Sequence, residues 1–175
     1  MKSTLLRTLT ITAAFACIAF AAKISTDYDH SADFGRYKTY SWMKVQAKTS
    51  LWQDRIVRDV DSQLQARGWT KVDSDADASV AAFGSTHDQR TLETFYNGFG
   101  GGWRWRGFDG GMATTTVDVT KVGTLVVDVF DTQSKKLLWR GSSTDTLSDK
   151  AEKNEKKLEK DVTEMFKHFP PKPRG

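Results

Sequence analysis

The chain has 175 residues, of which 11% are aromatic and 27% are charged, and the aromatic share favours a packed globular protein over a disordered one. Apart from the two basic residues of positions 1–22, the chain carries 24 lysines and arginines against 22 aspartates and glutamates. The resulting net charge of +2 argues against a protein built to bind nucleic acid.

Residues 1–22 have the layout of a cleavable secretory signal. Lys2 and Arg7 flank a short apolar run from Thr8 to Phe20, and the small residues Ala19 and Ala21 stand two apart at its end. The run is shorter than the roughly 20 apolar residues that a bilayer core requires, so a transmembrane anchor is disfavoured. We therefore expect an exported, periplasmic protein that is cut after Ala21 or one residue later.

Cys17 is the only cysteine, and it leaves a second route open. Bacterial lipoproteins are cut just before a cysteine that receives lipid, and Ala16 suits such a cut, whereas the bulky Phe15 does not. Lipidation at Cys17 would attach the protein to the outer membrane. Otherwise the thiol leaves with the signal, and the mature chain has no disulfide and no thiolate metal site.

The first part of the mature chain is predicted to form two strands and a helix. Residues 24–28 alternate in polarity, and 39–43 are rich in β-branched and aromatic side chains, so both are expected to be strands. A capping-box pattern at 50–53 opens a helix, and Gly68 marks its end. The apolar face of this helix consists of Trp52, Ile56, Val57, Val60 and Leu64.

Further strands are expected at 69–72, 76–87 and 114–130. A hairpin turn at 131–135 leads to a return strand that points Leu137 and Trp139 inward. The inward residues of the preceding strand are Leu125, Val127 and Val129.

A second capping-box pattern, at 146–149, opens the final helix, and Pro170 ends it. We therefore predict one α+β domain over 23–169, with a tail rich in proline and basic residues at 170–175. It is a two-layer sandwich of two helices on one face of a mostly antiparallel sheet of about five strands. The apolar stripe of the final helix consists of Ala151, Leu158, Val162, Met165, Phe166 and Phe169.

The sequence contains no recognisable catalytic, cofactor-binding or metal site. His30, His87 and His168 lie far apart and lack the spacing of metal ligands. The acidic repeat at 73–77 resembles the start of a calcium loop, but Ala78 stands where that loop requires glycine. We therefore expect no enzymatic activity, no cofactor and no bound metal.

The segment 98–111 is the one stretch with a specialised composition, because glycine fills seven of its fourteen positions. Aromatic and guanidinium groups alternate between these glycines, which suits contact with a glycan, a lipid headgroup or an acidic partner. The alternative is an insert whose aromatic side chains pack over the sheet edge. The candidate contact residues are Phe99, Trp103, Arg104, Trp105, Arg106 and Phe108.

Several short stretches together resemble the bacterial envelope proteins grouped as domain of unknown function 4136. They include Asp27-Tyr28-Asp29, the run 37–42, the run 123–128 and Leu138-Trp139-Arg140-Gly141. The resemblance implies an α+β fold in a Gram-negative cell envelope, in a family of mostly predicted lipoproteins without an established activity. It implies no catalytic residue.

We therefore expect a non-enzymatic binding or scaffold protein of the envelope, whose partner is an unidentified envelope protein, a glycan or a lipid headgroup. Two alternatives remain. One is a peripheral membrane protein held by the aromatic side chains of 98–111. The other is an envelope-polymer hydrolase, which would have to bring scattered carboxylates together in one cleft, such as Asp27, Asp29 and Asp118.

Signal cleavage can be tested directly on the exported protein. Its intact mass should correspond to a chain that starts at Ala22 or Lys23, because Ala19-Phe20-Ala21 closes a run too short to span a bilayer. A chain that instead starts at an acylated Cys17 would establish the lipoprotein route.

Overall fold

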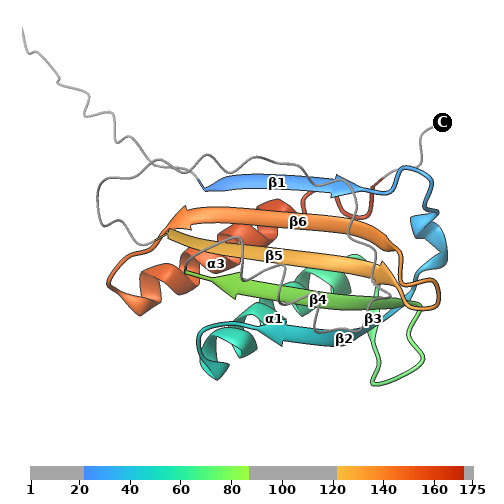
Figure 1. Ribbon diagram of the computed structural model, residues 1–175, viewed down its shortest axis with the longest axis horizontal. Coiled ribbons are helices and arrows are strands. Elements are labelled where there is room, and N and C mark those ends of the chain that lie inside the picture. Colours follow the sequence, from blue (N-terminus) through green and yellow to red (C-terminus); the bar gives the residue numbers. More distant parts are fainter. Residues whose placement is uncertain (1–21, 87–121, 172–175) are drawn as a thin grey trace, which may run out of the picture.

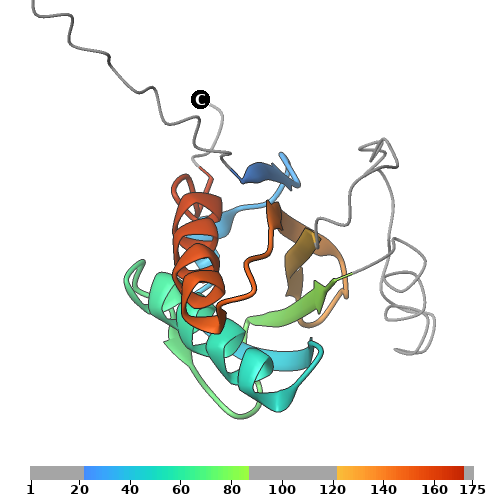
Figure 2. The ribbon, with the colours of Figure 1, turned by 90° about the vertical axis from the view of Figure 1, so that its left-hand side faces the viewer.

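The computed structural model describes residues 22–86 and 122–171, which form one mixed sheet with two helices on one face. Both helices lie on the same side of the sheet (Figures 1 and 2), so the predicted two-layer α+β architecture is confirmed. The strands are β1 (Lys23–Tyr28), β2 (Thr39–Gln46), β3 (Thr70–Lys71), β4 (Ala78–Ser85), β5 (Val122–Asp131) and β6 (Leu137–Thr146). The helices are α1 (Ser50–Gln65) and α3 (Ala151–Met165), with a short 3-10 turn η1 (Phe34–Arg36).

The sheet has six strands, in the order β1-β6-β5-β4-β2-β3, where the sequence predicts about five. The pairs β1–β6, β6–β5 and β5–β4 are antiparallel, which agrees with the prediction of a mostly antiparallel sheet. The pairs β4–β2 and β2–β3 are parallel. Parallel neighbours need a crossover connection, and α1 provides it because it follows β2 in the chain.

The two ends of α1 show how local sequence sets the helix. The predicted capping box at 50–53 is one residue late, because Thr49 is the N-cap and its side chain accepts a hydrogen bond from the backbone N–H of Trp52. At the other end Gly68 has a φ of 83°, and the N–H groups of Gly68 and Trp69 donate to carbonyls of the last turn at 2.9 and 3.1 Å. This Schellman arrangement needs the left-handed conformation, which explains the glycine.

The start of α3 differs from the prediction. Thr146 still belongs to β6, and the helix begins at Ala151 with Lys150 as an N-cap that makes no side-chain capping bond. Ser148 is instead bound to Asn154, whose side chain bonds both the N–H and the carbonyl of Ser148 at 2.7 Å. Ala151 is exposed, so it does not belong to the buried stripe.

An apolar layer lies between the sheet and the helices. Trp139 of β6 lies in this layer as predicted, but Leu137 packs with Phe130 in a small cluster on the other face. A β-bulge explains the difference. The register of β5 and β6 shifts between Val129 and Phe130, so Leu138 is an extra residue in β6 and the inward and outward alternation of its side chains reverses there. The strand β5 contributes the residues predicted for this layer: Leu125, Val127 and Val129.

Aromatic side chains fill one end of this layer. Trp139 lies 4.8 Å from Phe166 and 5.2 Å from Phe169 between ring centroids, and Trp69 lies 5.2 Å from Phe169. The two contacts of Phe169 are edge-to-face, and such pairs add to the free energy gained from burial. We call this set the aromatic cluster: Phe34, Tyr37, Trp69, Trp139, Phe166 and Phe169.

Gly141 lets α3 approach the sheet beside this cluster. A Cβ at this position would lie 2.4 Å from Cγ of Met165 and 2.5 Å from the ring of Trp139. Neither neighbour has room to withdraw, because Met165 and Trp139 are 1% and 2% exposed. Glycine is therefore required here by packing.

Trp139→Ala should lower the free energy of unfolding by about 3 to 5 kcal/mol, because it empties the centre of the aromatic cluster. Urea unfolding measures this loss. As a control, Leu51→Ala removes a side chain that is 65% exposed and should change stability by no more than about 0.5 kcal/mol. A loss below about 1 kcal/mol for Trp139→Ala would contradict the buried position of the indole.

Candidate functional site

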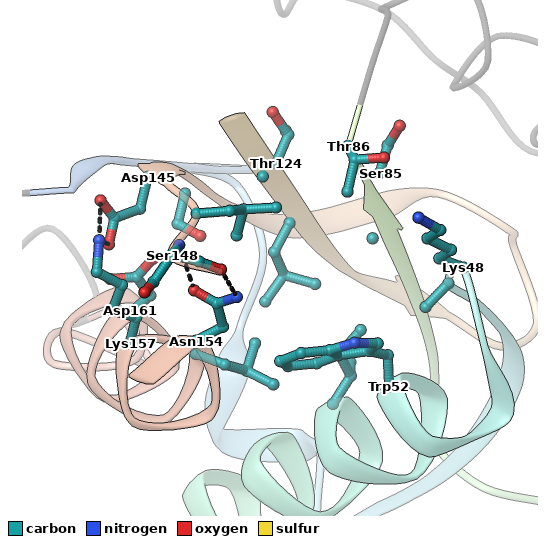
Figure 3. A pocket seen from close by; sticks show the side chains of 18 residues that line it. Lys48, Trp52, Ser85, Thr86, Thr124, Asp145, Ser148, Asn154, Lys157 and Asp161 are labelled. Carbon is teal, nitrogen blue, oxygen red and sulfur yellow. Dashed lines mark hydrogen bonds and ion pairs between the residues drawn. The ribbon is translucent and has the colours of Figure 1, made fainter. Parts of the chain in front are cut away.

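A cavity of about 400 Å³ opens at the end of the apolar layer opposite to the aromatic cluster. It is bounded by the start of α1, the first half of α3, the end of β4, the start of β5 and the end of β6 (Figure 3). Gly84, Gly123 and Ser143 line it on the sheet side. The glycines leave room for lining side chains, because a Cβ at Gly84 would lie 3.1 Å from Ile56 and one at Gly123 would lie 2.8 Å from Leu147.

The body of the cavity is apolar. The half-buried indole of Trp52 borders it, and Cζ of Arg55 lies 4.8 Å from the centroid of the Trp52 ring. This cation–π contact helps to hold the indole in place. The other apolar lining side chains are Ala47, Ile56, Leu125, Leu147 and Leu158.

Polar groups gather at the side formed by β6 and α3. The Nζ of Lys157 lies 3.1 Å from Asp145 and donates a 2.6 Å hydrogen bond to the carbonyl of Thr146 (Figure 3). Lys157 is therefore bound to the end of β6 and holds the Asp145 carboxylate in place.

Asp161 is the most buried ionisable group of the cavity, with an exposed fraction of 6%. Burial, and after it the negative charge of Asp145, raise the pKa of Asp161 to about 6. Hydrogen bonding from Ser143 and the charges of Lys157 and Lys160 act in the opposite direction. Within the described residues, no lysine or arginine forms an ion pair with this carboxylate.

Lys48 lies on the opposite side of the cavity from Asp145 (Figure 3), at the end of the segment that follows β2. It is exposed, so its ammonium group remains hydrated. The cavity thus has an acidic side built by β6 and α3 and a basic residue at the far rim, with apolar side chains between them.

The predicted contact residues of 98–111 lie outside the described residues, and so does Cys17. Their roles stay predictions. The described chain stops at Thr86 and resumes at Val122, and the rim of the cavity includes Thr86 and Gly123. The segment that carries 98–111 is therefore joined to the fold at this rim.

The scattered carboxylates have structural partners where the structure describes them. Asp29 forms an ion pair with Lys136 and accepts a 2.6 Å bond from the Ser31 hydroxyl. Asp27 is exposed on β1, and Asp118 lies outside the described residues. The hydrolase alternative is therefore left without an observation in its favour.

The acidic repeat that resembles a calcium loop also has a structural partner. The carboxylate of Asp77 accepts bonds of 2.9 Å from the backbone N–H groups of Lys38 and Thr39 and from the Thr39 hydroxyl. These bonds attach the start of β4 to the start of β2.

Over residues 22–86 and 122–171, no group of three acidic, histidine or cysteine side chains is placed to hold a metal ion. His30 packs edge-on against Tyr28 at 4.3 Å, His168 is exposed, and His87 is not described. No helix in these ranges is long and apolar enough to cross a membrane.

Sequence reasoning missed the cavity and its acidic side. The many lysines and glutamates of α3 predict a solvated surface, which conceals the one acid that points inward. The position of Asp161 is a usable signal, because it lies three residues after Leu158, next to Val162 and four before Met165. A carboxylate inside the apolar stripe of a helix is buried, and buried ionisable groups mark candidate sites.

The family model described as Domain of unknown function (DUF4136) matches residues 24–171. No curated protein matches the chain. The match covers all the described strands and helices except Lys23, the first residue of β1, and includes both sides of the cavity.

Among solved structures, a PDZ domain protein from Parabacteroides distasonis ATCC 8503 has a TM-score of 0.58 at 13% identity. That alignment covers 89% of this chain but only 37% of the other, so the likeness concerns the fold alone. The PelC dodecamer from Paraburkholderia phytofirmans has a TM-score of 0.45 at 12% identity, covering 83% of this chain and 91% of that chain. A minor lipoprotein from Acinetobacter baumannii has a TM-score of 0.35 at 14% identity, and the alignment covers 76% of this chain and 92% of that chain. Scores this low lend nothing to fold or function.

Asp161→Asn should change how stability depends on pH. Because the pKa of Asp161 is higher in the folded protein, folding favours the protonated form, and the free energy of unfolding of the wild type falls as pH rises from about 4 to about 6. The variant lacks this loss. Its stability relative to the wild type should therefore increase by about 1 to 3 kcal/mol between about pH 4 and pH 7.

Urea unfolding of both proteins at a series of pH values measures the difference. A difference that is the same at every pH would mean that Asp161 titrates as it does in the unfolded chain.

Proposed function

The chain belongs to the family described as domain of unknown function DUF4136, and from this premise we propose that it is an exported, non-enzymatic binding protein of the cell envelope. Its ligand site is the cavity between the start of α1, the first half of α3 and the end of the sheet. The ligand is a small molecule, or a terminal group of a larger one, with an apolar body and a polar end.

The cavity itself carries this proposal. Its volume of about 400 Å³ falls within the range of small-molecule sites, and its lining combines apolar side chains with a few polar groups on one side. The cavity opens to solvent at its rim, where Lys48 is exposed and Thr86 half-buried, so a ligand could enter it from there.

The chemistry of the lining favours binding over catalysis. No histidine is among the described residues that line the cavity, and Asp145 is already engaged by Lys157. Ser143 hydrogen-bonds the Asp161 carboxylate, but no histidine among the described lining residues completes a triad-like arrangement with them. The groups that remain can orient a ligand but do not form an activated nucleophile.

Export and envelope location rest on the signal-like residues 1–22 and on what the family resemblance implies. The predicted contacts in 98–111 remain part of the proposal as a second surface, for an envelope protein, a glycan or a lipid headgroup. The described chain stops at Thr86 and resumes at Val122, next to Gly123, and both Thr86 and Gly123 line the cavity.

Filling the cavity should abolish binding of an apolar probe. We expect tryptophol, a neutral indole alcohol, to shift the amide NMR signals of Ser85, Thr124 and Asn154, which border the cavity. Leu158→Trp places a larger side chain in this space and should lower the affinity for tryptophol at least about tenfold, or by roughly 1.4 kcal/mol. The matched control, Leu51→Trp, adds the same side chain at an exposed position of α1 and should leave binding unchanged.

Two results would count against the cavity as the site. One is the absence of shifts up to the solubility limit of tryptophol. The other is equal binding to the wild type and to Leu158→Trp in protein that remains folded.

A further inference from the structure

The acidic side of the cavity has one negative charge more than the lysine there can neutralise. Asp145 and Asp161 both line the cavity, and Lys157 is the lysine of the lining on this side. Its Nζ is shared between Asp145 at 3.1 Å and the carbonyl of Thr146 at 2.6 Å. In the described part of the chain, Asp161 has no ion-pair partner of its own.

Neighbouring donors cannot supply the missing partner. The amide of Asn154 is occupied by the backbone of Ser148 through two bonds of 2.7 Å. Lys160, which also acts on Asp161, is exposed and does not line the cavity. Ser143 provides hydrogen bonding but no charge. A buried carboxylate in such surroundings gains most from a cation that enters the cavity.

Resting on the function proposed above, we infer that the ligand is a small organic cation whose ammonium group pairs with Asp161 while its apolar body lies along Trp52 and Leu125. Lys48 supports this orientation, because it stands at the opposite rim and repels a positive group there (Figure 3). The indole ring of Trp52 and the aliphatic side chains around it suit a flat or branched hydrocarbon body.

Binding of such a cation should depend on pH through Asp161. The charged groups that face it are Asp145 from β6 and Lys157 and Lys160 from α3. Because the cation pairs with the ionised form, binding is favoured above the pKa of about 6 and is lost as Asp161 takes up its proton below it. A neutral ligand of the same shape does not depend on this charge.

The inference can be tested with three probes that share an indole ring: tryptamine as the cation, tryptophol as the neutral analogue and indole-3-propionate as the anion. In calorimetric titrations of the wild type near pH 7.5, tryptamine should bind at least about tenfold more tightly than tryptophol. Indole-3-propionate should bind more weakly than either. Between pH 7.5 and pH 5 the affinity for tryptamine should fall by about tenfold, whereas that for tryptophol should hold.

Asp161→Asn keeps the size of the side chain and removes its charge. It should reduce tryptamine binding to the level of tryptophol, with tryptophol binding unchanged as proof that the cavity is intact. Asp54→Asn, at an exposed position of α1, removes a charge elsewhere and should keep the preference for tryptamine. If Asp161→Asn fails to fold, the pH series on the wild type still decides the outcome.

Equal binding of tryptamine and tryptophol to the wild type, or tighter binding of the propionate, would overturn the cation inference and leave the cavity as a ligand site. Binding of none of the three probes would overturn the inference and the proposed function together.

Discussion

The distance between α3 and the sheet depends on one contact, between Met165 and Gly141. Any side chain at position 141 would push the helix outward, because the first atom would already overlap Met165 and Trp139. The contact fixes the C-terminal end of α3, next to the rings of the aromatic cluster. Toward its N-terminal end the helix lies beside Ser143 and Asp145 of β6 instead of aromatic rings, and the cavity opens there. One helix thus closes the core at one end and forms a wall of the candidate site at the other.

Polar interactions set the register of the strands that carry this arrangement. Arg140 binds Asp128 through two separate nitrogens, and the pair is buried on the face of the sheet away from the helices. Burying two charges costs hydration, and the two-pronged geometry offsets that cost. A slip of one residue between β5 and β6 would turn these charges into the apolar layer, so the pair restricts the strands to one alignment. On the helix side, Asp61 of α1 accepts hydrogen bonds of 2.8 Å from Tyr40 and Trp42 of β2.

Periodic segments with one buried face could be predicted from the sequence, and features that depend on distant contacts could not. The inward face of β5 and the end of α1 at Gly68 follow from alternation and from a conformation that only glycine adopts easily. The prediction that Leu137 points inward was wrong, because a bulge shifts the alternation of β6 and the composition gives no signal of a bulge. The parallel pairing of β2 and β4 was missed, although a helix between two strands permits it. The candidate site was not predicted, because the lysines and glutamates of α3 indicate a solvated surface and conceal the place of Asp161 in the apolar stripe.

The pairing of β4 with β5 has a consequence for how the family can vary. Ser85 and Thr124 face each other in the sheet, so the chain leaves and re-enters the fold at a single point. For a connection of this length, the entropy of closing the loop changes by only about 0.6 kcal/mol when the length doubles. Insertions and deletions between these two residues therefore change the entropy of loop closure only slightly. The junction of Ser85 and Thr124 is thus a point of the fold at which chain length can vary while the pairing of β4 with β5 is kept.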